Sequence, residues 1–148
     1  MGKLRYAASG DEIIDAMMAL ARCSRWHQII VAGANGPHRM FELHHRGYAR
    51  VATTETCGLP RGQYDVALVE WQVHSIKALS ATLDWLVNFI SPNGVLVIWI
   101  DDREHPDRRK LAALLQKLGF RIEAGTRSGH GLAVSARRLD AQQQVLAA

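Results

Sequence analysis

The stretch IIVAGANGPHRMF holds the first residues whose types and spacing suit chemistry. The apolar run Gln28–Ala32 ends in Gly33-Ala34-Asn35-Gly36, and Pro37 opens an expected helix. Glycine allows positive φ and a close approach of the backbone to a ligand, and Asn35 tolerates left-handed geometry better than most residues. A helix amino terminus also favours negative groups. This segment is therefore typical of a strand–turn–helix that holds a ligand.

Two further apolar runs end in polar or aromatic side chains. YDVALVEW ends in Glu70-Trp71, and VLVIWID ends in Asp101, with Asp102 after it. Open α/β sheets place ligands at the carboxyl ends of their strands. Glu70 and His74 are therefore candidate catalytic groups, His74 as a general base, and Trp71 and Asp101 are candidates to contact substrate. Each also has a structural alternative: Trp71 closes the core, and His74 and Asp101 belong to helix starts.

Histidines near the first turn do not form a convincing metal site. His38, His44 and His45 surround the helix that Pro37 opens, and Glu42 with His45 gives a Glu-x-x-His spacing. No second cluster completes a tetrahedral ligand set, so we expect no metal. The chain has neither a nucleophile elbow nor a GxxxxGK phosphate loop, which argues against hydrolase and P-loop chemistry.

Length and composition suit one globular domain. The chain has 148 residues, of which 48% are hydrophobic, enough to form a single core. We expect the domain to cover residues 1–138 and the polar, alanine-rich residues 139–148 to form a frayed tail. Cys23 and Cys57 form no CxxC pair, which fits reduced thiols. The apolar runs are too short to span a bilayer, and MGKLRYAASGDEI lacks the core of a signal peptide, so we expect a cytoplasmic protein without membrane contacts.

The basic charge balance points to no particular partner. The net charge is +4 and the pI is near 9.4. Lysines and arginines are spread along the chain, apart from Arg108-Arg109-Lys110 and Arg137-Arg138, and no aromatic residues interleave with them as stacking platforms. Nucleic-acid binding is therefore not expected, acidic partners remain open, and the acceptor of any reaction, small molecule or protein, is unidentified.

Periodicity predicts strands and helices in alternation. The expected helices cover Asp11–Arg22, Pro37–Arg46, Ser75–Ile90 and His105–Leu118, and the expected strands are Gln28–Ala32, YARVATTE, YDVALVEW and VLVIWID, followed by an antiparallel pair of FRIEAGTR and GLAVSARR around Ser128-Gly129-His130. Pro92-Asn93-Gly94 is expected to be a turn. Strands that are apolar throughout indicate a parallel sheet covered on both faces.

The second half of the chain resembles class I S-adenosylmethionine-dependent methyltransferases. The resemblance lies in the segment from LPRGQYDVALVEW to NGVLVIWIDD and in LAALLQKLGFRIEAGTR after it. Ser91-Pro92-Asn93-Gly94 is similar to the family's PGG-type turn, and the resemblance covers about residues 28 to 138. It implies a three-layer, Rossmann-like α/β fold: a mostly parallel sheet with a C-terminal antiparallel hairpin. Asp65 resembles an aspartate that orients neighbouring backbone in the family. The family's DPPY or NPPF signature is absent, which leaves amino-group methylation by that route unsupported.

The resemblance also implies where S-adenosylmethionine would lie. Gly33, Asn35 and Gly36 would form the cofactor turn, and Glu55, four residues before Leu59-Pro60, would contact the nucleoside. Two features of the family's first turn are missing. Val31 stands where an acid is expected, and Pro37 replaces the last glycine and removes a backbone donor.

The chain is shorter than the family pattern between its second and third expected strands. Only one strand, YARVATTE, lies between the first turn and Tyr64, where the family has two strands and a helix, so Glu55 would serve two acid positions. The eight residues Thr56–Gln63 reach about 26–29 Å when extended, just enough to recross a sheet without a helix. One strand is therefore expected to be missing, or YARVATTE pairs differently.

Two functions follow from this pattern. In the first, the chain binds S-adenosylmethionine with weak or lost methyl transfer, and Glu70, Trp71 or His74 faces the acceptor. In the second, it is a non-catalytic interaction or regulatory subunit. Fold alone cannot choose between them. A shortened sheet also exposes an edge, so self-association as a homodimer is expected.

Overall fold

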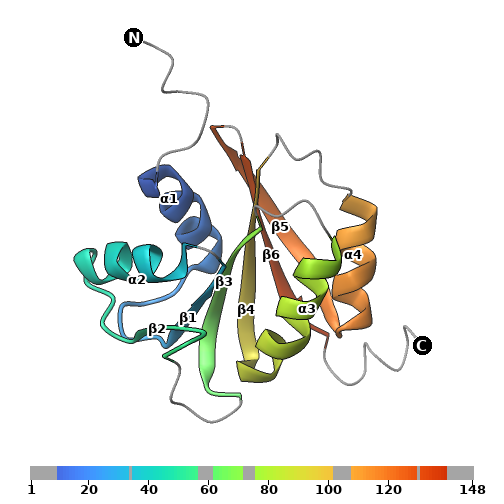
Figure 1. Cartoon of the computed structure of the whole chain (residues 1–148), viewed down its shortest axis with the longest axis horizontal. Coiled ribbons are helices and arrows are strands. Elements are labelled where there is room, and N and C mark those ends of the chain that lie inside the picture. The colour runs from blue at the N-terminus through green and yellow to red at the C-terminus, as the bar shows by residue number, and fades with distance from the viewer. Residues whose placement is uncertain are drawn as a thin grey trace.

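The sheet of this protein is mixed and is covered by helices on both faces. The computed structural model describes residues 10–33, 35–56, 62–71, 76–101, 108–129 and 131–139. In these ranges six strands form one sheet in the order β2-β1-β3-β4-β6-β5, with α1 and α2 on one face and α3 and α4 on the other (Figure 1). Strands β2, β1, β3 and β4 are parallel, and β6 is antiparallel to both of its neighbours. The predicted fold class is confirmed.

The bounds of most elements agree with the sequence prediction within a few residues. In chain order they are α1 Gly10–Ala21, β1 Ile29–Ala32, α2 Gly36–His45, β2 Val51–Thr53, β3 Tyr64–Trp71, α3 Ile76–Leu86, η2 Val87–Phe89, β4 Ile90–Asp101, α4 Arg108–Lys117, β5 Phe120–Ser128 and β6 Gly131–Arg138. Glycines end two of the helices: Gly47 (φ 93°) follows α2 and Gly119 (φ 87°) follows α4, because this conformation is unfavourable for other residues.

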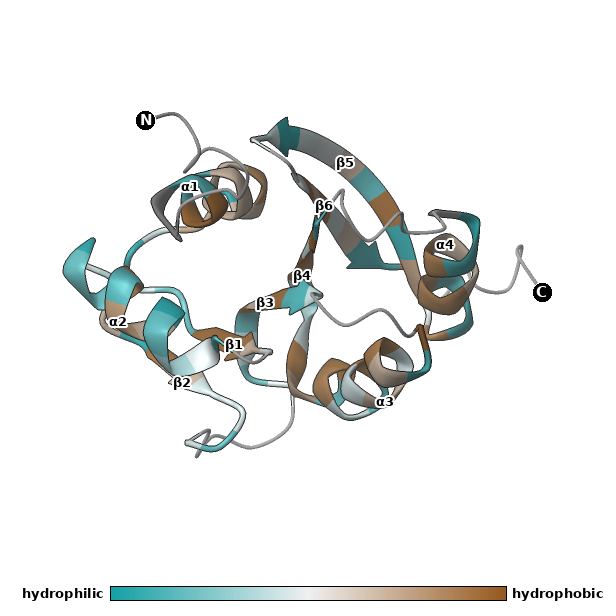
Figure 2. Ribbon diagram, turned by 45° about the horizontal axis from the view of Figure 1, so that its top comes forward, coloured by the Kyte–Doolittle hydropathy of each residue, from teal (hydrophilic) through white to brown (hydrophobic). Residues whose placement is uncertain are grey.

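Strand residues alternate between two apolar cores, one on each face of the sheet. In β3, for example, Val66 and Leu68 face α1 and α2, whereas Ala67 and Val69 face α3 and α4. The central strands are therefore apolar on both sides, which explains their lack of polar alternation. Figure 2 shows hydrophobic residues of α1, α3 and α4 on the sides of these helices that face the sheet, whereas α2 buries Leu43 and leaves Phe41 exposed.

Two local predictions were wrong. Residues 91–94 do not form a separate turn but lie within β4, where Tyr64 pairs with Ile90 and Val66 pairs with Val95. A step of two residues in β3, from Tyr64 to Val66, thus matches a step of five in β4, and the three extra residues of β4 form a bulge. Gly94 is needed there, because a Cβ would lie 2.5 Å from the side chain of Ile90. The helix expected over Ser75–Ile90 ends at Leu86 and continues as the 3-10 turn η2.

Among the described residues, the sheet has no strand in the place that the family resemblance predicts between β2 and β3 in the chain. β2 pairs with β1 as Val51 with Ile29, and β3 pairs with β1 on its other side. The chain therefore crosses from one side of β1 to the other, which is the first of the two alternatives left open by the sequence. Within the described residues β2 is an outer strand of only three residues, less than half of the expected YARVATTE.

Several expectations concern residues outside the described ranges. These are the candidate base His74, Asp102, Cys57, the hairpin tip His130, the start of the helix expected from His105, and the tail after Leu139. Leu139 itself is tied to the domain, since its N–H donates to the Gly119 carbonyl at 2.8 Å. Among the described helices, none is long and apolar enough to cross a membrane.

Asp65 joins the beginnings of two parallel strands. Its carboxylate accepts a hydrogen bond from the Gln28 N–H at 2.8 Å, and its own N–H donates to the Gln28 carbonyl at 2.8 Å. This double connection fixes β1 beside β3 immediately before their ladder begins. The expected role of Asp65 in orienting neighbouring backbone agrees with these contacts.

Replacing Asp65 with alanine is predicted to lower the free energy of unfolding by about 1–3 kcal/mol, because the Gln28 N–H loses a charged acceptor. Chemical denaturation measures this change. Asp84→Ala, at an exposed carboxylate on α3, is the matched control and should change stability by less than about 0.5 kcal/mol. Equal effects of the two substitutions would contradict the role given to Asp65.

Candidate functional site

The candidate site lies where the direction of the chain connections reverses, between β1 and β3. From β1 the chain goes to β2 on one side, and from β3 it goes to β4 on the other. Ligands of open α/β sheets bind at such switch points, outside the carboxyl ends of the strands. Here β1 ends at Ala32, opposite Val69, and Gly33 follows beside Glu70. The structure thus brings two of the predicted site residues together.

Gly33 is fixed as glycine by its conformation and by its neighbour. Its φ is 113°, and a Cβ at this position would lie 3.0 Å from the carbonyl oxygen and 3.4 Å from the nitrogen of Glu70. L-residues with a side chain rarely adopt this φ. The glycine allows β1 to turn sharply into α2 while the turn packs directly on β3. Its presence is explained by backbone packing alone, without a ligand.

The amino terminus of α2 offers few free backbone donors. The first N–H groups of a helix normally have no partner within the helix. Here the Gly36 N–H donates to the Gly33 carbonyl at 3.1 Å, and Pro37 has no N–H. Asn35 is the N-cap, yet its side chain does not cap the helix and instead donates to Glu70 Oε2 at 3.3 Å. The capacity of this end of the helix to bind an anion is therefore reduced.

Arg39 is the central residue of the site, and sequence reasoning missed it. It comes from the second turn of α2 and reaches Glu70 with two donors: Nε bonds Oε1, and Nη2 bonds Oε2 at 3.2 Å. Its Nη1 donates to Glu42 Oε1 at 2.6 Å. Only 8% of the Arg39 side chain and 4% of the Glu70 side chain are exposed. The pair is a two-pronged, buried ion pair.

The surroundings of Arg39 favour its charged form. Burial lowers its pKa, but the hydrogen bonds and charges of Glu70 and Glu42 outweigh burial and raise the pKa above its ordinary value. Apolar side chains from α1, β1 and β3 enclose the pair: Ile14, Met17, Val31 and Leu68. These described residues leave no space for a water molecule between them. The Glu70 carboxyl group is therefore enclosed with its guanidinium partner and is not an exposed base.

Glu55 stands at the same edge of the sheet, after β2. Its side chain is exposed, and the turn that carries it is closed by its neighbours. Thr56 Oγ1 accepts from the Thr53 N–H at 3.0 Å, and the Thr56 N–H donates to the Thr53 carbonyl at 3.1 Å. Gly36 approaches the same strand, with its Cβ position 3.8 Å from the Thr53 methyl group. The four residues expected to bind the cofactor thus lie on two adjacent strand–turn segments.

Trp71 and Glu70 cannot act as a pair toward one ligand, because neighbouring strand residues point to opposite faces. Glu70 faces α1 and α2, whereas Trp71 is buried in the core beneath α3 and α4. Trp71 Nε1 is buried and has no hydrogen-bond partner within the described residues. Asp101, at the end of β4, is half-buried and lies opposite Gly131 of β6. The substrate roles of Trp71 and Asp101 stay predictions.

Two other candidate chemistries gain no support in the described part of the chain. Within it, no three His, Cys, Asp or Glu side chains gather as a metal-ligand group. The half-buried thiol of Cys23 has a raised pKa, mainly because burial disfavours the thiolate, with Asp65 adding to the shift. A thiol with a raised pKa is a poor nucleophile near neutral pH.

Comparison with known proteins identifies the fold. No family model matches the sequence, and no curated protein is similar enough in sequence to match. A SAM-dependent methyltransferase from Aquifex aeolicus superposes with a TM-score of 0.66 at 13% identity, covering 93% of this chain and 96% of that one. A 1,6-didemethyltoxoflavin-N1-methyltransferase from Burkholderia thailandensis, solved with S-adenosylhomocysteine, gives 0.54 at 16% identity, covering 84% and 75%.

The mitomycin 7-O-methyltransferase MmcR gives a TM-score of 0.57 at 17% identity, covering 76% of this chain. This chain spans about half of that protein, 49% of its length. The fold is that of class I S-adenosylmethionine-dependent methyltransferases, in the shortened and divergent form that the sequence predicted. At these identities the likeness establishes fold and not activity.

Arg39→Met is predicted to lower the free energy of unfolding by about 3–5 kcal/mol, because it leaves the buried Glu70 carboxylate without its partner. The double variant Arg39→Met/Glu70→Met should recover most of this loss, since no buried charge remains. Urea unfolding followed by circular dichroism measures both.

The matched control is Asp15→Asn, which breaks the Arg46–Asp15 ion pair on the surface, where Asp15 is 68% exposed. It should reduce stability by no more than about 1 kcal/mol. If Arg39→Met were no more destabilising than this control, Arg39 and Glu70 would not form the buried pair described.

Proposed function

We propose that this chain is a methyltransferase-like domain that binds S-adenosylmethionine or S-adenosylhomocysteine weakly and has little or no methyl-transfer activity. The observation that carries the proposal is the engagement of Glu70 by Arg39 and Asn35 at the switch point. Glu70 lies beside Gly33 at the end of β3, the edge of the sheet where a base would be needed. A base must be able to reach the proton that it removes, and a carboxylate enclosed with a guanidinium does not meet this condition.

Weak binding follows from the start of α2. Gly36 has its N–H bonded within the turn, Pro37 lacks one, and Asn35 is directed toward Glu70. Val31, where the family has an acid, is buried with the Arg39 side chain against it. Among the described residues at this edge, the polar side chain left for a nucleoside is the exposed Glu55 carboxylate. Binding through so few polar contacts is expected to be weak.

Isothermal titration with S-adenosylhomocysteine tests this proposal. We expect saturable binding with a dissociation constant on the order of 1 mM, which corresponds to about 4 kcal/mol. Glu55→Gln should weaken binding by about tenfold or more, because a hydrogen bond to a charged group contributes roughly 1.5–3 kcal/mol. It should leave the melting temperature unchanged, because Glu55 is exposed.

Asp84→Asn is the control for the loss of one negative charge far from the switch point, and it should not change the affinity. Submicromolar binding, or binding that is insensitive to Glu55→Gln, would contradict weak recognition through this edge. No heat and no thermal shift at millimolar ligand would contradict cofactor binding altogether and favour the second function.

That second function is a non-catalytic interaction or regulatory subunit. It is favoured by the hydrogen bonds that Arg39 and Asn35 make to Glu70. These bonds stabilise the fold and engage side chains at the place where a cofactor would bind.

A homodimer remains a prediction. Light scattering tests it by looking for a mass twice the 16.4 kDa of one chain, and a monomer at high concentration would contradict it. Thr56 already satisfies both the N–H and the carbonyl of Thr53, so pairing through β2 is disfavoured.

A further inference from the structure

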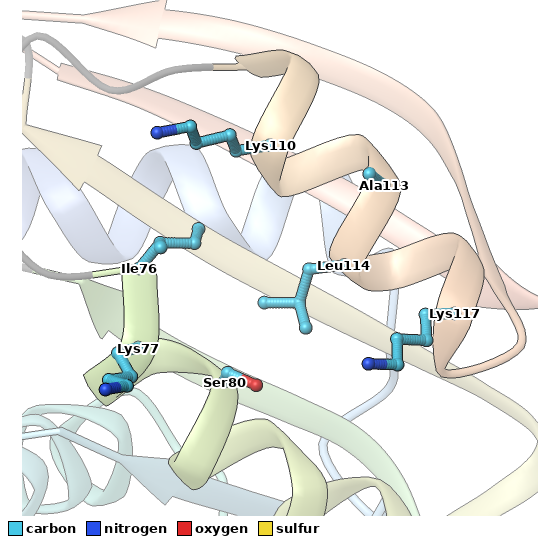
Figure 3. Close-up of a pocket in the computed structure, with 7 residues that line it drawn as sticks. All are labelled: Ile76, Lys77, Ser80, Lys110, Ala113, Leu114 and Lys117. Carbon is cyan, nitrogen blue, oxygen red and sulfur yellow. The ribbon is translucent and has the colours of Figure 1, made fainter.

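A groove between α3 and α4 lies on the opposite face of the sheet from the Arg39–Glu70 pair. It has a volume of about 560 Å³ and is lined by Ile76, Lys77, Ser80, Lys110, Ala113, Leu114 and Lys117. The two helices pack mainly on the sheet and only lightly on each other. Their facing sides therefore stay open between them (Figure 3).

The middle of the groove is apolar. Ile76, from the first turn of α3, and Leu114, from the middle of α4, approach each other across it (Figure 3). Both are only partly buried and pack on the edge of the core below. Further along the groove the Ser80 hydroxyl and the Lys117 ammonium group point toward each other from opposite sides. An occupant could thus insert apolar side chains centrally and place polar groups at the rims.

The charged residues that line the groove are all lysines. Lys77 on α3 and Lys110 and Lys117 on α4 are all exposed, and none of the seven lining residues is acidic. Lys110, Leu114 and Lys117 stand at positions i, i+4 and i+7, which places them on one face of α4. The two lysines are two turns apart, about 10.5 Å along the helix axis. Each rim therefore presents positive charge beside the apolar centre.

We propose that this groove binds an acidic amphipathic helix of a partner protein. A helix laid along the groove would insert one or two apolar side chains between Ile76 and Leu114, and carboxylates seven residues apart on it would match Lys110 and Lys117. A single-headed anionic amphiphile would satisfy only one rim position at a time. The open shape of the groove also suits a helix better than an enclosed small molecule. This proposal does not depend on cofactor binding at the switch point.

The test uses a synthetic helical peptide of leucine, alanine and glutamate, with leucines on one face and glutamates seven residues apart along its flanks. Methyl NMR of the isotope-labelled protein follows Ile76 and Leu114 during titration. We expect saturable shifts at these two residues, weaker at high salt. The same peptide with glutamine in place of glutamate should bind at least about tenfold more weakly, because it loses its charge attraction to the rims.

The matching protein variant is Lys77→Gln/Lys110→Gln/Lys117→Gln, which should reduce affinity for the acidic peptide by about tenfold or more. Arg50→Gln/Arg121→Gln/Arg127→Gln removes the same charge from exposed residues elsewhere and should leave the affinity within about twofold of the natural chain. All six positions are exposed, so both variants should fold. Their melting temperatures verify this.

Three results would overturn the proposal. The first is an absence of saturable shifts at Ile76 and Leu114 with the acidic peptide. The second is equal weakening by the two triple variants, which would indicate attraction to net charge instead of to the groove. The third is saturable binding of decanoate at the same methyl groups with displacement of the peptide, which would identify the occupant as a small anionic amphiphile.

Discussion

The buried ion pair between Arg39 and Glu70 is the constraint on which the rest of this structure depends. A carboxylate at the end of a central strand is costly to bury unless it is paired and hydrogen-bonded. Arg39 satisfies both of its oxygens, Asn35 adds a donor, and Glu42 holds the far side of the guanidinium. Helices α1 and α2 can therefore pack over this end of the sheet with no room for water among the described residues around the pair. The ion pair that stabilises the fold thus also engages Glu70, the side chain that was the candidate base.

The short β2 edge of the sheet also affects both the stability of the fold and the surface available to a ligand. In the described part of the chain, the side of the sheet that would hold adenosine in the family ends in the three residues of β2 and a turn closed by Thr53 and Thr56. That turn presents Glu55 to solvent. The edge is thus both small and capped, which limits aggregation and also limits the surface available to a nucleoside. The fold is kept while this edge of the sheet is reduced.

Much of the architecture was predictable from the sequence because local signals agree with the global fold. YDVALVEW and VLVIWID are apolar on both faces, and Gly47 and Gly119 end α2 and α4 in conformations that glycine favours. The bulge at residues 91–94 was not predictable, because Pro92-Asn93-Gly94 has the same composition as a turn, and only the pairing of Tyr64 with Ile90 fixes it within β4. The candidate site was predicted in part: Gly33, Asn35, Gly36 and Glu70 do come together. Arg39, the buried partner of Glu70, was missed, since it is 31 residues from Glu70 and resembles an ordinary helix-surface arginine paired with Glu42.

The most direct test of the central claim is the hydrogen exchange of the Arg39 Nε–H with water, measured by NMR. If this proton is bonded to Glu70 in a closed space, it should exchange far more slowly than the Nε–H of the exposed Arg50, and saturating S-adenosylhomocysteine should leave its resonance unchanged. Exchange as fast as that of Arg50, or displacement of the signal by the ligand, would contradict the account, because Glu70 would then be free to serve a bound substrate.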